Sequence, residues 1–240
     1  MIEDIEALLF DKDGTLVDFD RTWGPAAGAV MGILAAGDGE RLARLHAVSA
    51  YLPAEQRFEP WSPLVAGSSL HYGPLWAQVL GVPASPAFLT RIDMLFAEEG
   101  QRFLTPIGRP DKALARLARG GLALGMVTND AEANARRQAD ALGLSQWLDS
   151  IAGYDSGYGS KPDPGMVLAG AAQGGHVPGR VAVVGDTAHD LDAARAAGAQ
   201  FILVRSGPAP VEHLASAADL VIDSVDDLPD VLFGAMSCGA

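Results

Sequence analysis

Short apolar runs that alternate with helical segments constrain the fold of this chain more than any other feature. The runs that resemble buried strands cover residues 5–10, 122–127, 181–184, 201–204 and 220–222. The segments with the apolar spacing of helices cover residues 112–119, 132–142, 166–172 and 188–197. Short strands that alternate with helices of this length are typical of βαβ units, whose sheets are parallel. We therefore predict an α/β fold built on a parallel sheet.

Residues 17–104 interrupt this alternation and read as a helical insert. Helical patterns cover residues 40–52 and 89–103, and no run in the insert resembles a strand. The insert also carries Trp23, Trp61 and Trp76. We expect these tryptophans to be core residues, with the exception of Trp23, whose role stays open because it lies close after the first predicted strand. We predict a helical domain over residues 17–104, inserted after the first strand of a sheet domain formed by residues 1–16 and 105–240.

Composition restricts what the chain binds and where it works. Its 30 acidic and 17 basic residues give a net charge of −13, which opposes binding to a nucleic-acid backbone. No stretch approaches the ~18 apolar residues that cross a bilayer, and the N-terminus lacks the basic start of a signal peptide. The single cysteine, Cys238, cannot form an internal disulfide, as suits a reducing compartment. We expect a cytoplasmic protein without nucleic-acid or membrane partners, and the oligomeric state stays open.

Polar side chains follow several of the predicted strands at the point where each strand ends. Asp11 and Asp13 follow the first strand, Thr128 and Asn129 follow the second, and Asp186 follows the third. The carboxyl ends of parallel strands meet at one edge of a sheet, and ligands bind in the crevice outside that edge. We therefore expect these side chains to converge there, although they are far apart in the sequence.

Lysine is rare in this chain, which has three lysines and 14 arginines, so the positions of the lysines are informative. Lys161 precedes a proline, which disfavours a helical conformation, and its compact charge suits a phosphate or a pair of carboxylates. Lys12 lies between Asp11 and Asp13. In an extended chain its side chain alternates away from both acids, so we assign it no catalytic role.

The segments that carry these residues resemble the four motifs of the haloacid dehalogenase (HAD) superfamily. In family order they are Phe10-Asp11-Lys12-Asp13-Gly14-Thr15-Leu16, Val127-Thr128-Asn129, Ser160-Lys161-Pro162 and Val184-Gly185-Asp186-Thr187-Ala188-His189-Asp190. The match covers the sheet domain, and residues 17–104 take the place of the family's helical cap. The resemblance implies a Rossmann-like parallel sheet core with helices on both faces. The first and fourth motifs are most similar to those of the phosphoglycolate phosphatase-like group.

This resemblance implies a phosphatase that acts on small phosphorylated metabolites. Asp11 would attack phosphorus, because a carboxylate nucleophile splits a difficult hydrolysis into two steps through an aspartyl-phosphate. Asp13 would protonate the leaving oxygen and then deprotonate the attacking water. Thr128, Asn129 and Lys161 would bind the phosphoryl oxygens, over which the transition-state charge is spread.

The resemblance also implies Mg²⁺, which prefers oxygen ligands and offsets the repulsion between carboxylates and a phosphate dianion. Asp11 and Asp186 would supply carboxylates and Asp13 its backbone carbonyl. Asp190 would lie behind the ligands and orient Lys161 or a metal-bound water. Gly14 fits the sharp turn after the strand, because glycine alone adopts positive φ freely.

Other functions remain open at this stage. A phosphomutase would use the same residues but return the phosphoryl group to a sugar. A catalytically silent regulatory protein could keep the same fold. The dehalogenases of the superfamily attack carbon and lack the second aspartate, so Asp13 and Asp186 argue against that branch. The motifs do not name a substrate, and phosphoglycolate is a first guess from the resemblance.

Overall fold

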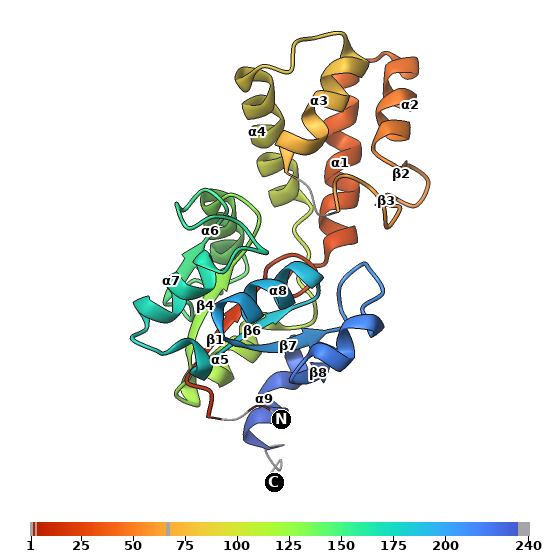
Figure 1. Cartoon of the computed structure of the whole chain (residues 1–240). Helices are drawn as coiled ribbons and strands as arrows, with labels where there is room; N and C mark the ends of the chain where they lie inside the picture. The colour runs from red at the N-terminus through yellow and green to blue at the C-terminus, as the bar shows by residue number, and fades with distance from the viewer. Residues whose placement is uncertain (1, 3, 66–67, 235–240) are drawn as a thin grey trace. The chain divides into compact units, whose positions relative to one another are not determined.

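The computed structural model describes residues 2, 4–65 and 68–234 and divides the chain into two compact units (Figure 1). One unit comprises Met1–Asp18 and Pro106–Ala240, and the other comprises Phe19–Thr105. Among the described residues, every helix is too short or too polar to cross a bilayer. Cys238, the lone cysteine, lies outside the described part of the chain.

The first unit is built on a six-stranded parallel sheet (Figure 1). Its strands, in order across the sheet, are β5 (Ser150–Ala152), β4 (Ala123–Val127), β1 (Ala7–Phe10), β6 (Val181–Gly185), β7 (Gln200–Val204) and β8 (Leu220–Ile222). The first strand is central, since β4 pairs with it on one side and β6 on the other. The ends of β1, β4 and β6 therefore lie next to one another, at the edge where the motif residues follow.

Helices cover both faces of this sheet. Alternate residues of β1, Leu8 and Phe10, pack in a layer with the helices α5 (Pro110–Arg119), α6 (Glu132–Ala141) and α9 (Leu228–Phe233). The intervening residues of β1, Ala7 and Leu9, pack in a second layer with α7 (Gly165–Gln173) and α8 (Ala188–Ala197). Short 3₁₀ helices η1 (Pro178–Arg180), η2 (Glu212–Ala217) and η3 (Val225–Asp227) complete the unit. The predicted α/β fold with helices on both faces is confirmed.

The second unit has a helical core of its own. It contains α1 (Phe19–Ala35), α2 (Gly39–Val48), α3 (Ser69–Leu80) and α4 (Pro86–Arg102), with a short hairpin of β2 (Tyr51–Leu52) and β3 (Arg57–Phe58). Met31, Trp76 and Ile92 are fully buried in this core. The indole N–H of Trp76 donates a hydrogen bond of 2.8 Å to the hydroxyl of Ser49, so its polar atom is satisfied.

Three expectations for the insert were wrong. The helix predicted over residues 40–52 ends at Val48, because Ala50 adopts a positive φ of 45° and the chain then enters β2. That hairpin was itself not expected. Trp61 is 73% exposed and is not a core residue, whereas Trp23 is half-buried with its ring centre 6.1 Å from that of Phe96.

Candidate active site

A buried lysine joins two carboxylates at the carboxyl edge of the sheet. Lys161 Nζ donates to Oδ1 of Asp11 at 2.5 Å and to Oδ1 of Asp190 at 2.6 Å. All three side chains are buried. Asp11 follows β1 directly, and its N–H donates to the carbonyl of Val184 on β6 at 2.8 Å, which extends the sheet pairing by one residue. The carboxylate of Asp11 is therefore held rigidly at the strand end.

The first turn of α8 fixes Asp190. Its Oδ2 accepts hydrogen bonds from the N–H of Thr187 at 3.0 Å and from the Thr187 hydroxyl at 2.6 Å, in a capping box that begins the helix. The other oxygen contacts Lys161. One oxygen of Asp190 is therefore held by Thr187, and the other is left to bind the ammonium of Lys161. These contacts suit a residue that orients Lys161.

Asn129 clamps the backbone of Lys161. Its Nδ2 donates to the Lys161 carbonyl at 3.0 Å, and the Lys161 N–H donates to its Oδ1 at 2.8 Å. Thr128, just before it, is buried at the end of β4, and its hydroxyl accepts the N–H of Asp130 at 3.1 Å. The amide of Asn129 thus holds the lysine loop against the end of β4, and its contact with substrate stays a prediction.

Asp186 lies in a cradle formed by two glycines. A Cβ on Gly14 would come within 2.3 Å of Oδ2 of Asp186, and a Cβ on Gly207 would come within 1.9 Å. The Thr15 hydroxyl donates to the other oxygen of Asp186 at 3.1 Å. Gly14 has a φ of 85°, so the expected positive φ is confirmed.

The loop after β7 is a part of this edge that the motif comparison missed. The Ser206 hydroxyl donates to the carbonyl of Gly14 at 2.8 Å, and Gly207 lies against Asp186. The available signal was position: the two residues follow the apolar run 201–204, so the argument from strand ends applies to them as well.

The carboxylates form a group that suits a hard cation. Asp11, Asp186 and Asp190 each offer an oxygen within 4.8 Å of the others, and Lys161 is the cation that contacts Asp11 and Asp190. Burial raises the pKa of Asp11 to about 7, although Lys161 acts in the opposite direction. Burial and the neighbouring carboxylates also raise the pKa of Asp186 well above its usual value. When all are ionised, three buried carboxylates outnumber the one ammonium that contacts them, and carboxylate oxygens are ligands that Mg²⁺ prefers.

Lys12 does not point away from both acids, and that expectation was wrong. Its Nζ lies 2.7 Å from Oδ2 of Asp13. The extended strand ends at Phe10, and the chain turns sharply at Gly14, so the alternation along β1 does not continue to Asp13. Lys12 itself is fully buried, whereas the side chain of Asp13 is 20% exposed.

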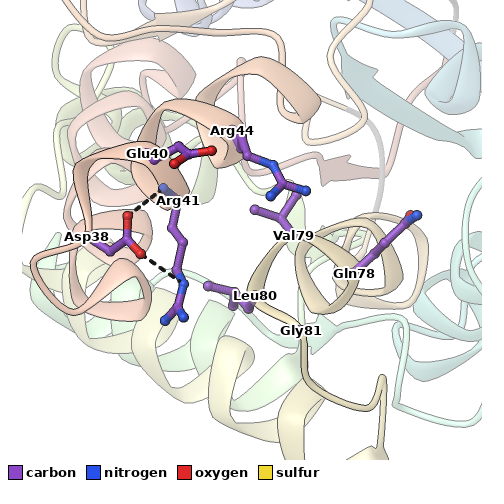
Figure 2. Close-up of a pocket in the computed structure, with 8 residues that line it drawn as sticks. All are labelled: Asp38, Glu40, Arg41, Arg44, Gln78, Val79, Leu80 and Gly81. Carbon is purple, nitrogen blue, oxygen red and sulfur yellow. Dashed lines mark hydrogen bonds and ion pairs between the residues drawn. The ribbon is translucent and has the colours of Figure 1, made fainter.

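A separate hollow of about 340 Å³ lies on the insert, and Figure 2 shows its lining. Its residues come from α2, α3 and the turns beside them: Asp38, Glu40, Arg41, Arg44, Gln78, Val79, Leu80 and Gly81. Asp38 caps α2 by accepting the Arg41 N–H at 3.0 Å and pairs with Nε of the same residue at 3.1 Å. No motif residue lines this hollow, so the motif chemistry lies elsewhere.

Comparison with known proteins identifies the family of this chain. The profile of the haloacid dehalogenase-like hydrolases matches residues 5–198. The plasmid phosphoglycolate phosphatase of Cupriavidus necator is 39% identical over 130 residues, about half of each protein (51% of this chain and 53% of that one). The phosphoglycolate phosphatase of Shigella dysenteriae is 28% identical over 94% of this chain and 92% of that protein.

Among solved structures, a Thermotoga maritima protein named as a candidate β-phosphoglucomutase superposes with a TM-score of 0.70. The two chains are 21% identical, and the match covers 97% of this chain and 100% of that one. This likeness concerns the fold. The relatives confirm the resemblance to the phosphoglycolate phosphatase-like group, and the chain belongs to the haloacid dehalogenase-like hydrolases.

Proposed function

We propose that this hydrolase is a Mg²⁺-dependent phosphatase of small phosphate monoesters. The observation that carries the proposal is the ion pair of Asp11 with Lys161, with Asp186 beside them at the carboxyl edge of the sheet. In this proposal Asp11 would be the nucleophile, Lys161 would bind the phosphoryl group and Asp186 would hold the cation, and their closeness in one buried space supports these roles. Two relatives named phosphoglycolate phosphatase support the substrate class.

The reaction would proceed in two steps through Asp11. In the first, an oxygen of Asp11 attacks phosphorus and forms an aspartyl-phosphate, while the departing alcohol oxygen takes a proton from Asp13. In the second, water attacks phosphorus and gives a proton to Asp13, and the P–O bond to Asp11 breaks. Inorganic phosphate leaves, and both carboxyl groups return to their starting states.

Lys161 and Thr128 would bind the phosphoryl oxygens during these steps. The ammonium of Lys161 remains charged in its buried position: burial lowers its pKa, but Asp11 and Asp190 raise it more. The carboxylates of Asp11 and Asp186 and the backbone carbonyl of Asp13 would hold Mg²⁺, whose charge, when bound, offsets the repulsion between carboxylates and a phosphate dianion.

Charge and chain connectivity support a small substrate. A net charge of −13 disfavours substrates that carry many phosphates. The insert joins the sheet unit through two chain segments, near Asp18 and near Thr105, and such a connection permits hinge motion. We propose that the insert, residues 17–104, acts as the cap domain and selects a small monophosphate, with phosphoglycolate as the first candidate.

The test is a panel of phosphoglycolate, sugar phosphates, nucleotides and a phosphopeptide, assayed for phosphate release with Mg²⁺ and with a chelator. We expect the highest kcat/KM on a small monophosphate and no turnover with the chelator. Preference for the phosphopeptide would refute the small-substrate proposal. Isomerisation of a sugar phosphate without phosphate release would favour a phosphomutase, and no release from any ester would refute the phosphatase.

A further inference from the structure

Lys12 lies in the nucleophile motif and has no role in the mechanism described so far. Its side chain is completely buried, and its Nζ contacts side-chain oxygens of Gln138, Asp13 and Asp130. Gln138 Oε1 accepts a hydrogen bond at 2.7 Å, and Nζ lies 2.7 Å from Oδ2 of Asp13 and 3.1 Å from Oδ2 of Asp130.

Two of the three partners are themselves fixed by α6 and the residues that lead into it. Gln138 is a fully buried residue of α6. Asp130 accepts the N–H of Ala131 at 2.7 Å and the side-chain amide of Asn134 at 2.6 Å. The third partner, Asp13, lies instead on the loop that follows β1. Lys12 therefore links the carboxylate of Asp13 to α6, which packs against the sheet, and to the segment that leads into this helix.

The side chain of Gln138 indicates that its hydrogen bond with Lys12 is a specific feature of the structure. Its Nε2 is buried without a hydrogen-bond partner, so the amide forms its side-chain hydrogen bond through Oε1, with Lys12. A buried unpaired N–H is costly, and an apolar residue of similar size would avoid that cost.

We propose that Lys12 is a positioning residue that holds the carboxylate of Asp13 for proton transfer to the departing alcohol. The inference rests on the proposed function, in which Asp13 is the general acid. A general acid must lie within hydrogen-bond reach of the oxygen that it protonates, and the Asp13 side chain is partly exposed on a loop. The ion pair with a buried, immobile ammonium restricts where that carboxylate can go.

Leaving-group dependence separates this role from a merely structural one. An aryl phosphate such as p-nitrophenyl phosphate releases a stable anion and needs little help from an acid, whereas an alkyl phosphate releases a basic alkoxide and needs the proton. The experiment compares kcat/KM of Lys12→Met on p-nitrophenyl phosphate and on the alkyl monophosphate that the wild-type enzyme hydrolyses fastest. The value of kcat/KM depends on the steps up to the release of the alcohol. It therefore does not depend on the later hydrolysis of the aspartyl-phosphate, which is the same for both esters.

We expect kcat/KM of Lys12→Met to fall ~10- to 100-fold on the alkyl ester and less than ~3-fold on the aryl ester, as part of the ~10²- to 10⁴-fold contribution of a general acid. The matched control is Lys112→Met, which removes the same charge from an exposed position and should leave both rates unchanged. Equal losses on the two esters would overturn the positioning role. Wild-type turnover of both esters supports the proposed function separately, so the two failures are distinguishable.

A second variant keeps the test decisive if Lys12→Met does not fold. Gln138→Leu removes the partner of Lys12 that lies within α6 but retains the ion pairs of Lys12 with Asp13 and Asp130. We expect a smaller loss with the same selectivity for the alkyl ester. A variant that folds, as measured by circular dichroism and thermal unfolding, and that hydrolyses both esters at the wild-type ratio would also overturn the inference.

Discussion

Alanine at Gly207 tests whether Asp186 must occupy its observed position. The added Cβ would lie 1.9 Å from Oδ2 of Asp186, about 1.5 Å closer than the 3.4 Å at which ordinary contact begins. Gly207 does not have a positive φ of the kind that alanine avoids, so the strain falls on the contact and not on the backbone. The carboxylate must therefore move by more than ~1 Å, or the loop after β7 must move with it.

The displacement of the Asp186 carboxylate sets the expected loss of Mg²⁺ affinity and of activity. A misplacement of about 1 Å lowers a rate ~10²-fold, and disturbed support of a metal ligand lowers affinity ~10- to 100-fold. We expect Gly207→Ala to weaken Mg²⁺ binding and to reduce kcat/KM by ~10- to 100-fold, which corresponds to ~1.4–2.7 kcal/mol. Calorimetric titration with Mg²⁺ and the activity at increasing Mg²⁺ concentration measure the two effects.

The matched control is Gly179→Ala, because a Cβ there meets no atom within 4 Å. This variant should bind Mg²⁺ and hydrolyse substrate as the wild-type enzyme does. Wild-type Mg²⁺ affinity and activity in Gly207→Ala would refute the assignment of Asp186 as a metal ligand held by the glycine cradle.

Three further predictions concern the reacting groups. Asp11→Asn should lower kcat by several orders of magnitude without loss of the fold, because no aspartyl-phosphate can form; near-wild-type kcat would exclude Asp11 as the nucleophile. Lys161→Ala should weaken binding of inorganic phosphate, measured as its inhibition constant, and an unchanged constant would remove Lys161 from the phosphate site. The pKa of Asp11, raised to about 7, favours the folded metal-free protein at low pH, and this contribution is lost as the pH rises through 7. Mg²⁺ should therefore raise Tm more at pH 8 than at pH 5.5, and an equal increase at both would contradict this reasoning.

Local sequence patterns were sufficient for the framework of the sheet unit. A strand buried on both faces must be apolar along its whole length, so β1, β4, β6, β7 and β8 were visible as short runs. Strand β5 was missed because its sequence, Ser150-Ile151-Ala152, holds a single large apolar residue, whereas β8, which is equally short, is Leu220-Val221-Ile222. In the insert, α1 and α3 contain Pro25 and Pro74, which interrupt the helical signal that the sequence would otherwise show.

The sequence by itself determined which residues stand at the strand ends, because a motif and a strand are both local. Only the tertiary structure decided what those residues contact. Lys12 reaches Gln138, which is 126 positions away, and Ser206 bonds to Gly14 across 192 positions. Such contacts depend on which strands become neighbours in the sheet and on where the chain leaves its extended conformation. For that reason the alternation along β1 misplaced Lys12, and the packing of α6 against the sheet placed it beside Asp13.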